Sequence, residues 1–140
     1  GDVEVSKPLF LDTNVVLQFF TGPSPRLTHA ISSADRIFIP LASYGELQIG
    51  FAEKTRRAEL QETKLEQLLS LPNVEVHLMT LRTAVEYSRI YNQLKAQGTP
   101  IPINDIWIAA EVFETGGQLY SCDGHFAKIP MLDWIDGRRA

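Results

Sequence analysis

The chain has 140 residues, 44% of them hydrophobic and 21% charged, which fits one globular domain with its own core over residues 1–140, with residues 1–7 as a loosely ordered head. No run approaches the roughly 18 consecutive apolar residues that a membrane span needs, and no secretory signal is recognisable, so we expect a cytoplasmic protein. The net charge of −4 indicates no basic surface, and a single cysteine, Cys122, excludes a disulfide framework and a thiolate zinc site.

Strand and helix patterns alternate along the chain. Continuous apolar runs at 9–11 and 37–39 are typical of strands covered on both faces, and the alternating run at 74–78 is typical of an edge strand or a half-exposed one. We predict strands at 8–12, 36–39, 74–78, 118–121 and near 131–132. We predict helices up to about 33 and over 41–70, 81–97 and 105–115. This alternation predicts an α/β fold, with a central, mostly parallel sheet flanked by helices.

The helix predicted over 81–97 has a recognisable stripe and end. Gly98 supplies the left-handed residue that commonly closes a helix. One face of the helix carries Leu81, Ala84, Val85, Ser88 and Tyr91.

Three aspartates stand at predicted boundaries between elements. Asp12 and Asp123 each close a buried strand, and Asp105 opens a helix. Each has an ordinary structural explanation, as a helix cap, a turn residue or a partner of the helix dipole. However, the carboxyl ends of parallel strands line a common crevice, so these side chains can converge there.

Glu46 favours a shared metal site over separate structural roles for these acids. It lies in a helix whose other members are mostly apolar or small, such as Leu47 and Ile49. An unpaired carboxylate in buried surroundings costs several kcal/mol or becomes protonated, unless a cation or hydrogen-bond donors meet it. Oxygen ligands without a cluster of cysteines or histidines favour Mg²⁺ or Mn²⁺ over zinc.

Four sequence motifs carry a family resemblance. They are Leu11-Asp12-Thr13-Asn14, Ser43-Tyr44-Gly45-Glu46-Leu47, Asn104-Asp105-Ile106-Trp107-Ile108-Ala109-Ala110 and Ser121-Cys122-Asp123-Gly124-His125-Phe126. In order and spacing they resemble the motifs of PIN-domain ribonucleases, and most of all the VapC toxins of toxin–antitoxin pairs. The resemblance extends from Pro8 to about Leu132.

The resemblance implies a single PIN-like nuclease domain, built as a three-layer sandwich. It implies an endoribonuclease that hydrolyses RNA phosphodiester bonds with one or two Mg²⁺ or Mn²⁺ ions. The implied catalytic residues and metal ligands are Asp12, Glu46, Asp105 and Asp123, and the polar residues around them are Thr13, Asn14, Asn104 and Ser121. It also implies a homodimer held inactive by a cognate antitoxin.

Two other functions stay open. Asp12 could be the phosphorylated residue of a phosphoacceptor or phosphatase-like α/β domain, with Lys128 assisting, although phosphatases of the haloacid dehalogenase type place an aspartate where this chain has Asn14. A non-catalytic PIN-like interaction module is the other alternative, and retention of Glu46 argues against it.

The sequence leaves the roles of several other polar residues undecided. His125 stands two residues after Asp123, where a solvated turn residue is the commoner case. Basic residues that could contact RNA phosphates, or simply face solvent, are Arg26, Lys54, Arg56 and Arg57.

Overall fold

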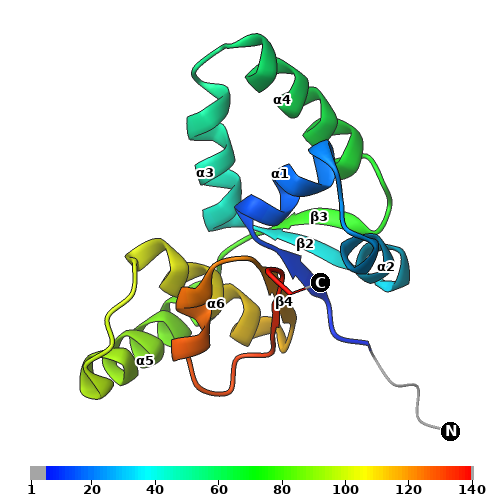
Figure 1. Cartoon of the computed structure of the whole chain (residues 1–140). Coiled ribbons are helices and arrows are strands. Elements are labelled where there is room, and N and C mark those ends of the chain that lie inside the picture. Colours follow the sequence, from blue (N-terminus) through cyan, green and yellow to red (C-terminus); the bar gives the residue numbers. More distant parts are fainter. Residues whose placement is uncertain (1–5, 140) are drawn as a thin grey trace, which may run out of the picture.

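The computed structural model describes residues 6–139 and contains a parallel sheet of five strands in the order β3-β2-β1-β4-β5 (Figure 1). The strands are β1 (Leu9–Leu11), β2 (Ile37–Pro40), β3 (Val74–His77), β4 (Gln118–Ser121) and β5 (Trp134–Asp136). All four neighbouring pairs are parallel, so the predicted parallel sheet is confirmed, and β3 is the edge strand that its alternating pattern predicts. Residues 1–5 of the predicted head lie outside the described residues.

Helices cover both faces of this sheet. They are α1 (Thr13–Thr21), α2 (Pro25–Ser33), α3 (Leu41–Phe51), α4 (Arg56–Leu69), α5 (Leu81–Gln97) and α6 (Ile103–Thr115), with a 3₁₀ helix, η1, at Gly124–Lys128. Helices α1 to α4 pack on one face, and α5, α6 and η1 pack on the other (Figure 1). The three-layer α/β sandwich is therefore confirmed. No helix in the described part of the chain is long and apolar enough to cross a membrane.

The side chains of β1 show why the central strands read as continuous apolar runs. Leu9 and Leu11 enter the core beneath α1 to α4, whereas Phe10 enters the core beneath α5 and α6. Successive side chains of a strand point to opposite faces, so a strand covered on both sides must be apolar at every position.

The apolar stripe that the sequence shows on α5 lies on its exposed face. Leu81 is 90% exposed and Val85 is 67% exposed, while the buried face carries Ile90 and Leu94. Both stripes have helical spacing, and only the position of the neighbouring α6 decides which one is buried.

Two predicted boundaries are wrong. The last strand was expected near 131–132 but lies at Trp134–Asp136, because Met131 has a φ of 68° and occupies a turn that a strand cannot accommodate. Helix α6 begins at Ile103, two residues before the predicted start, with Pro102 at its N-cap. Asp105 therefore lies in the first turn of α6 and does not cap it.

Candidate metal centre

The sheet order explains where the acidic residues meet. The chain passes from β1 to β2 and β3 on one side and then crosses back to place β4 on the other side of β1. Ligand sites of open α/β sheets lie at such a switch point, beside the carboxyl ends of the strands. Asp12 follows β1 here, and Asp123 follows β4 after one intervening residue.

Asp12 is buried and held by donors from three parts of the chain. Its Oδ1 accepts hydrogen bonds from the Thr13 backbone N–H at 2.7 Å and from Ser43 Oγ at 3.2 Å. Its Oδ2 accepts from Ser121 Oγ at 2.6 Å and from Asn14 Nδ2 at 3.4 Å. Asp12 thus caps α1, as its ordinary explanation requires, while its carboxylate also faces the crevice residues Ser43 and Ser121.

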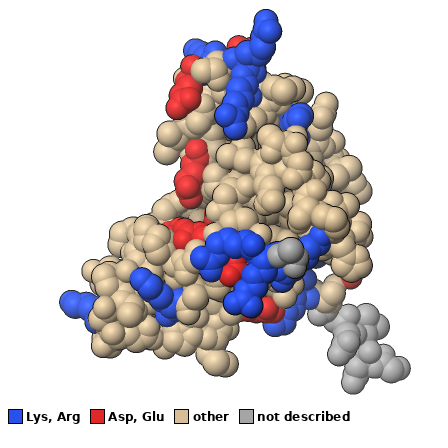
Figure 2. Space-filling model, viewed as in Figure 1, with Lys and Arg blue, Asp and Glu red and all other residues tan. Residues whose placement is uncertain are grey.

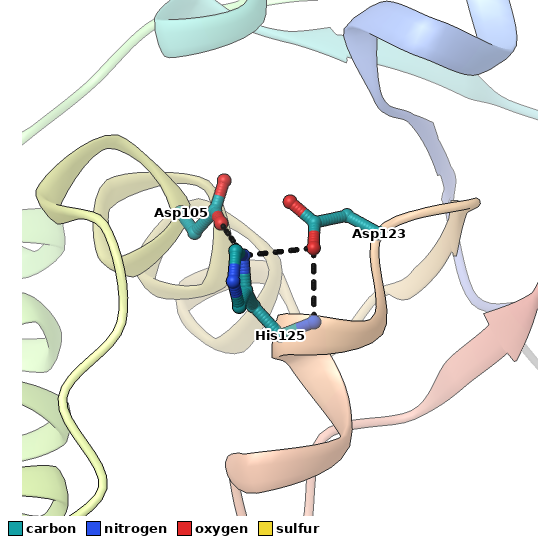
Figure 3. Close-up of side chains that lie close together, drawn as sticks. All are labelled: Asp105, Asp123 and His125. Carbon is teal, nitrogen blue, oxygen red and sulfur yellow. Dashed lines mark hydrogen bonds and ion pairs between the residues drawn. The ribbon is translucent and has the colours of Figure 1, made fainter.

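A second group joins α6 to the turn after β4 (Figure 3). His125 Nδ1 lies 3.2 Å from Asp105 Oδ2 and 2.9 Å from Asp123 Oδ1. One potential ligand atom from each of these three residues lies within 4.8 Å of the others. His125 was not predicted as a site residue. The feature that could have identified it is its position two residues after Asp123, because the 3₁₀ turn η1 brings its side chain back to the Asp123 carboxylate.

Glu46 lies at the rim of the site and not in buried surroundings. Its residue is exposed, as is Ile49 in the following turn of α3, so the predicted buried environment is wrong. Asn104 Nδ2 donates a hydrogen bond to Glu46 Oε1 and joins α6 to α3 across the crevice. Thr13 Oγ1 is buried and has no hydrogen-bond partner among the described residues, so a polar group at the crevice remains available to a ligand or water.

Three of the four carboxyl groups are harder to ionise than usual, and Asp123 is the exception. Burial, and then the charge of Asp123, raise the pKa of Asp12. The Glu46 residue is exposed, but its carboxyl group is partly desolvated by the neighbouring protein, and this desolvation, followed by the charge of Asp12, raises its pKa. Burial, and then the adjacent Asp123 carboxyl, raise the pKa of Asp105 to about 7. Burial alone would raise the pKa of Asp123 as well, but the His125 N–H and the Asp105 carboxyl outweigh it and lower that pKa. The acids are close enough that a cation would relieve their repulsion.

Ser121 and Asn14 connect Asp12, at the start of α1, with the segment after β4 that carries Asp123. Ser121 Oγ donates to Asp12 and accepts from the Asp123 N–H at 3.0 Å, so one buried hydroxyl orients two of the acids. Asn14 Oδ1 accepts from the Cys122 N–H at 3.2 Å, which ties the end of β4 to α1. Of the predicted surrounding residues, Thr13, Asn14, Asn104 and Ser121 all lie at the crevice.

Ser43 is a site residue that was not predicted, although it lies three residues before Glu46 and therefore on the same face of α3. Among the basic residues, Arg26 donates to the backbone oxygens of Asp136 and Arg139 and so fastens the end of the described chain. Lys54 and Arg56 lie beside the α3–α4 turn, away from the N-terminal half of α3 that carries Ser43 and Glu46.

Arg138 also lies close to the site, and no pattern in the sequence pointed to it. A Cβ added at Gly124, next to Asp123, would meet Arg138 Nη1 at 2.7 Å. Asp136 pairs with this guanidinium through two contacts of 2.8 Å. Figure 2 shows basic and acidic side chains next to one another around the C-terminal end of the described chain.

The donors suit a hard divalent cation. Carboxylate oxygens match Mg²⁺ and Mn²⁺, and the imidazole of His125 adds a ligand type that transition metals accept more readily than Mg²⁺. The fixed orientation of Asp12 and the unpartnered Thr13 hydroxyl are consistent with a built ligand site.

This fold and acidic crevice agree with the result of comparison with protein families. The PIN domain family model matches residues 9–132, so the chain belongs to the PIN domain family. The resemblance seen in the four motifs is thereby confirmed. Ribonuclease VapC1 of Haemophilus influenzae strain R2866 is 27% identical over 136 residues, covering 90% of this chain and 95% of that protein.

Solved structures give the same fold. The VapBC-1 structure from nontypeable Haemophilus influenzae matches with a TM-score of 0.81 and 26% identity, over 94% of this chain and 99% of that one. VapBC2 from Rickettsia felis, bound to a DNA fragment from its promoter, matches with a TM-score of 0.80 and 21% identity, over 91% and 97% of the two chains.

Proposed function

We propose that this chain is a metal-dependent endoribonuclease that hydrolyses RNA phosphodiester bonds, and that it is the toxin of a VapBC-type toxin–antitoxin pair. The observation that carries the proposal is the convergence of Asp12, Glu46, Asp105 and Asp123 at one crevice of a PIN domain. The relatives named ribonuclease VapC1 support the reaction and the RNA substrate. The VapBC structures support an antitoxin partner.

In this proposal the four acids, with His125 at their edge, hold one or two Mg²⁺ or Mn²⁺ ions. A divalent ion bound there would lower the pKa of a water molecule and stabilise negative charge on the phosphodiester. Ser43 and Ser121 fix the Asp12 carboxylate by hydrogen bonds, and Asn104 fixes Glu46. Asp105, with a pKa of about 7, releases its proton when a cation arrives, so ion binding should strengthen as the pH rises through neutrality.

Arg138 and Arg139 are proposed to contact RNA phosphates beside the acids. Their side chains are 55% and 82% exposed, and Asp136 neutralises only one of the two charges. The overall charge of −4 does not prevent this, because four of the acidic groups would be offset by bound cations.

The phosphoacceptor alternative receives no support from the site. A phosphatase of the haloacid dehalogenase type needs a second aspartate two positions after the phosphorylated one. Here that position is Asn14, whose side chain makes hydrogen bonds with Asp12 and with the Cys122 N–H.

We further propose a homodimer acting in the cytoplasm, as the family resemblance implies. The exposed apolar stripe of α5 supports self-association: Leu81, Val85 and Tyr91, together with Ile103 of α6, give an apolar surface that a second copy of the chain could cover. Sedimentation of the wild type and of Val85→Glu tests this, since a dimer using this surface should dissociate in the variant.

The nuclease proposal is tested with purified protein and structured RNA. Cleavage should require Mg²⁺ or Mn²⁺, stop in EDTA, and leave a 5′-phosphate and a 3′-hydroxyl, the products of attack by water on the phosphorus with departure of the 3′ oxygen. Activity that persists in EDTA, or products with a 2′,3′-cyclic phosphate, would overturn the mechanism.

A further inference from the structure

Helix α3, which carries Ser43 and Glu46, begins without a cap of its own. It follows β2 directly, and the residue at its N-cap is Pro40, which offers no side-chain acceptor. The first backbone N–H groups of any helix lack partners within the helix and need acceptors from elsewhere. The structure provides them from α6.

Glu111 of α6 accepts hydrogen bonds from the first two backbone N–H groups of α3. Its Oε1 accepts from the Leu41 N–H at 2.8 Å, and its Oε2 accepts from the Ala42 N–H at 3.2 Å. The residue is completely buried. A carboxylate at this position also complements the positive end of the α3 dipole. The cap of α3 thus comes from a residue that is 70 positions away in the sequence.

Glu111 is itself held by the edge strand. His77, the last residue of β3, places Nδ1 at 2.8 Å from Glu111 Oε1 and Nε2 at 2.9 Å from Glu114 Oε1. The two glutamates differ in the helix whose start they contact: Glu111 contacts α3, and Glu114 contacts α5. Glu114 also accepts hydrogen bonds from Thr80 and Thr83, at the start of α5, and its hydrogen bonds to the described residues include none to α3.

We propose that Glu111 is a positioning residue for the acidic site. Helix α6 carries Asp105 at one end and Glu111 two turns further on, while α3 carries Ser43 and Glu46. The Glu111 cap fixes the start of α3 against α6. It thereby sets the distance of Glu46 from Asp105 and the direction of the Ser43 hydroxyl toward Asp12.

This inference rests on the proposed function only in using a divalent ion as a reporter of the site. The test compares Glu111→Gln with the matched variant Glu114→Gln. Both variants remove from α6 a charge that contacts His77 of β3, but only the first disturbs the α3 cap. Glu111→Asp serves as a second variant that keeps the charge, since its shorter side chain cannot reach both N–H groups; it replaces Glu111→Gln if that protein does not fold.

The first measurement is made without metal, by NMR. Replacing Glu111 should reduce hydrogen-exchange protection at the Leu41 and Ala42 amides and shift the Asn104 side-chain amide, which contacts Glu46. Glu114→Gln should leave all three signals unchanged. If the two glutamate variants change them equally, Glu111 is only a structural residue and the proposal is overturned.

The second measurement is Mn²⁺ affinity by calorimetry, well below the melting temperature of each protein. Replacing Glu111 should weaken binding by about tenfold, as is usual when a group that orients a metal ligand is lost, whereas Glu114→Gln should not. In a Glu46→Ala background, the Glu111 variant should have a smaller effect than in the wild type, since only the route through Ser43 and Asp12 remains. A full additional loss there overturns that route. A wild type that binds no divalent ion refutes the proposed function instead, and the NMR measurement then decides the positioning role alone.

Discussion

At the scale of single residues, the acidic site is a source of instability until a cation reaches it. Burial, and then Asp123, raise the pKa of Asp105 to about 7. An acid whose pKa is raised by folding contributes stability that is complete below its unfolded value of 3.8 and is lost as the pH rises through about 7. The metal-free protein should therefore lose stability between roughly pH 4 and pH 8.

Asp105→Asn should abolish cleavage and yet stabilise the metal-free protein at pH 8. Asparagine removes a buried charge and can still satisfy nearby groups by hydrogen bonding, so we expect a gain on the order of 1 kcal/mol, or roughly 3–5 °C in Tm. Melting curves with and without Mn²⁺ measure this. Mn²⁺ should raise the Tm of the wild type by mass action and that of the variant much less. A variant that melts well below the metal-free wild type would identify Asp105 as chiefly structural.

His125 should discriminate between the two candidate ions. Its imidazole bridges Asp105 and Asp123, and nitrogen ligands favour transition metals over Mg²⁺. His125→Ala should weaken Mn²⁺ binding by about tenfold and Mg²⁺ binding less. His29→Ala, an exposed histidine on α2, is the control. Equal losses for the two ions would show that His125 acts only by holding the carboxylates.

At the scale of secondary-structure elements, the sequence predicts those features that depend on neighbouring residues along the chain. The runs ending at Asp12 and Asp123 predict strands whose carboxyl ends meet, because strand pattern and parallel topology suffice for that inference. The buried face of α5 could not be predicted from the sequence. The helix carries two apolar stripes, and only its packing against α6 determines which of them is buried. Glu111 stood within an apolar run of α6, but its partner is an uncapped helix that no local pattern reveals.

The junction of β3 and α6 should make stability depend on pH. Burial alone would lower the pKa of His77, but Glu111 and Glu114 outweigh it and raise the pKa above 6.5. The stabilisation is therefore complete below 6.5 and is lost as the pH rises through the raised value. His77→Gln should cost about 3 kcal/mol at pH 6 and less at pH 9, measured by urea unfolding. A difference that does not change with pH would show that folding leaves the pKa of His77 unshifted.

The turn after β5 should contribute to RNA binding through charge. In an Asp105→Asn background, which keeps RNA intact, replacing Arg138 and Arg139 with glutamine should weaken binding and lower the slope of log K against log salt by about 1 to 2. Arg57→Gln at the start of α4 is the control. An unchanged slope for the double variant, with a reduced slope for the control, would move the RNA path to the α3–α4 hairpin.

At the scale of the whole molecule, the net charge of −4 and the four acids of the crevice predict how a partner inhibits the enzyme. An arginine or lysine placed among carboxylates pairs strongly when water is excluded, and it occupies the position that a divalent ion needs. We therefore expect an antitoxin that presents a basic side chain to the crevice.

A complex co-purified after expression with the neighbouring reading frame should show no cleavage and a much weaker Mn²⁺ affinity than the free chain. Inhibition should be relieved as Mn²⁺ is raised, because the two cations compete for the same oxygens. Replacing the basic residues of the partner's contact segment one at a time with glutamine should restore Mn²⁺ binding at one position while the complex stays assembled. If all of them can be replaced without changing either inhibition or Mn²⁺ competition, the partner inhibits by covering the crevice, and charge has no part in it.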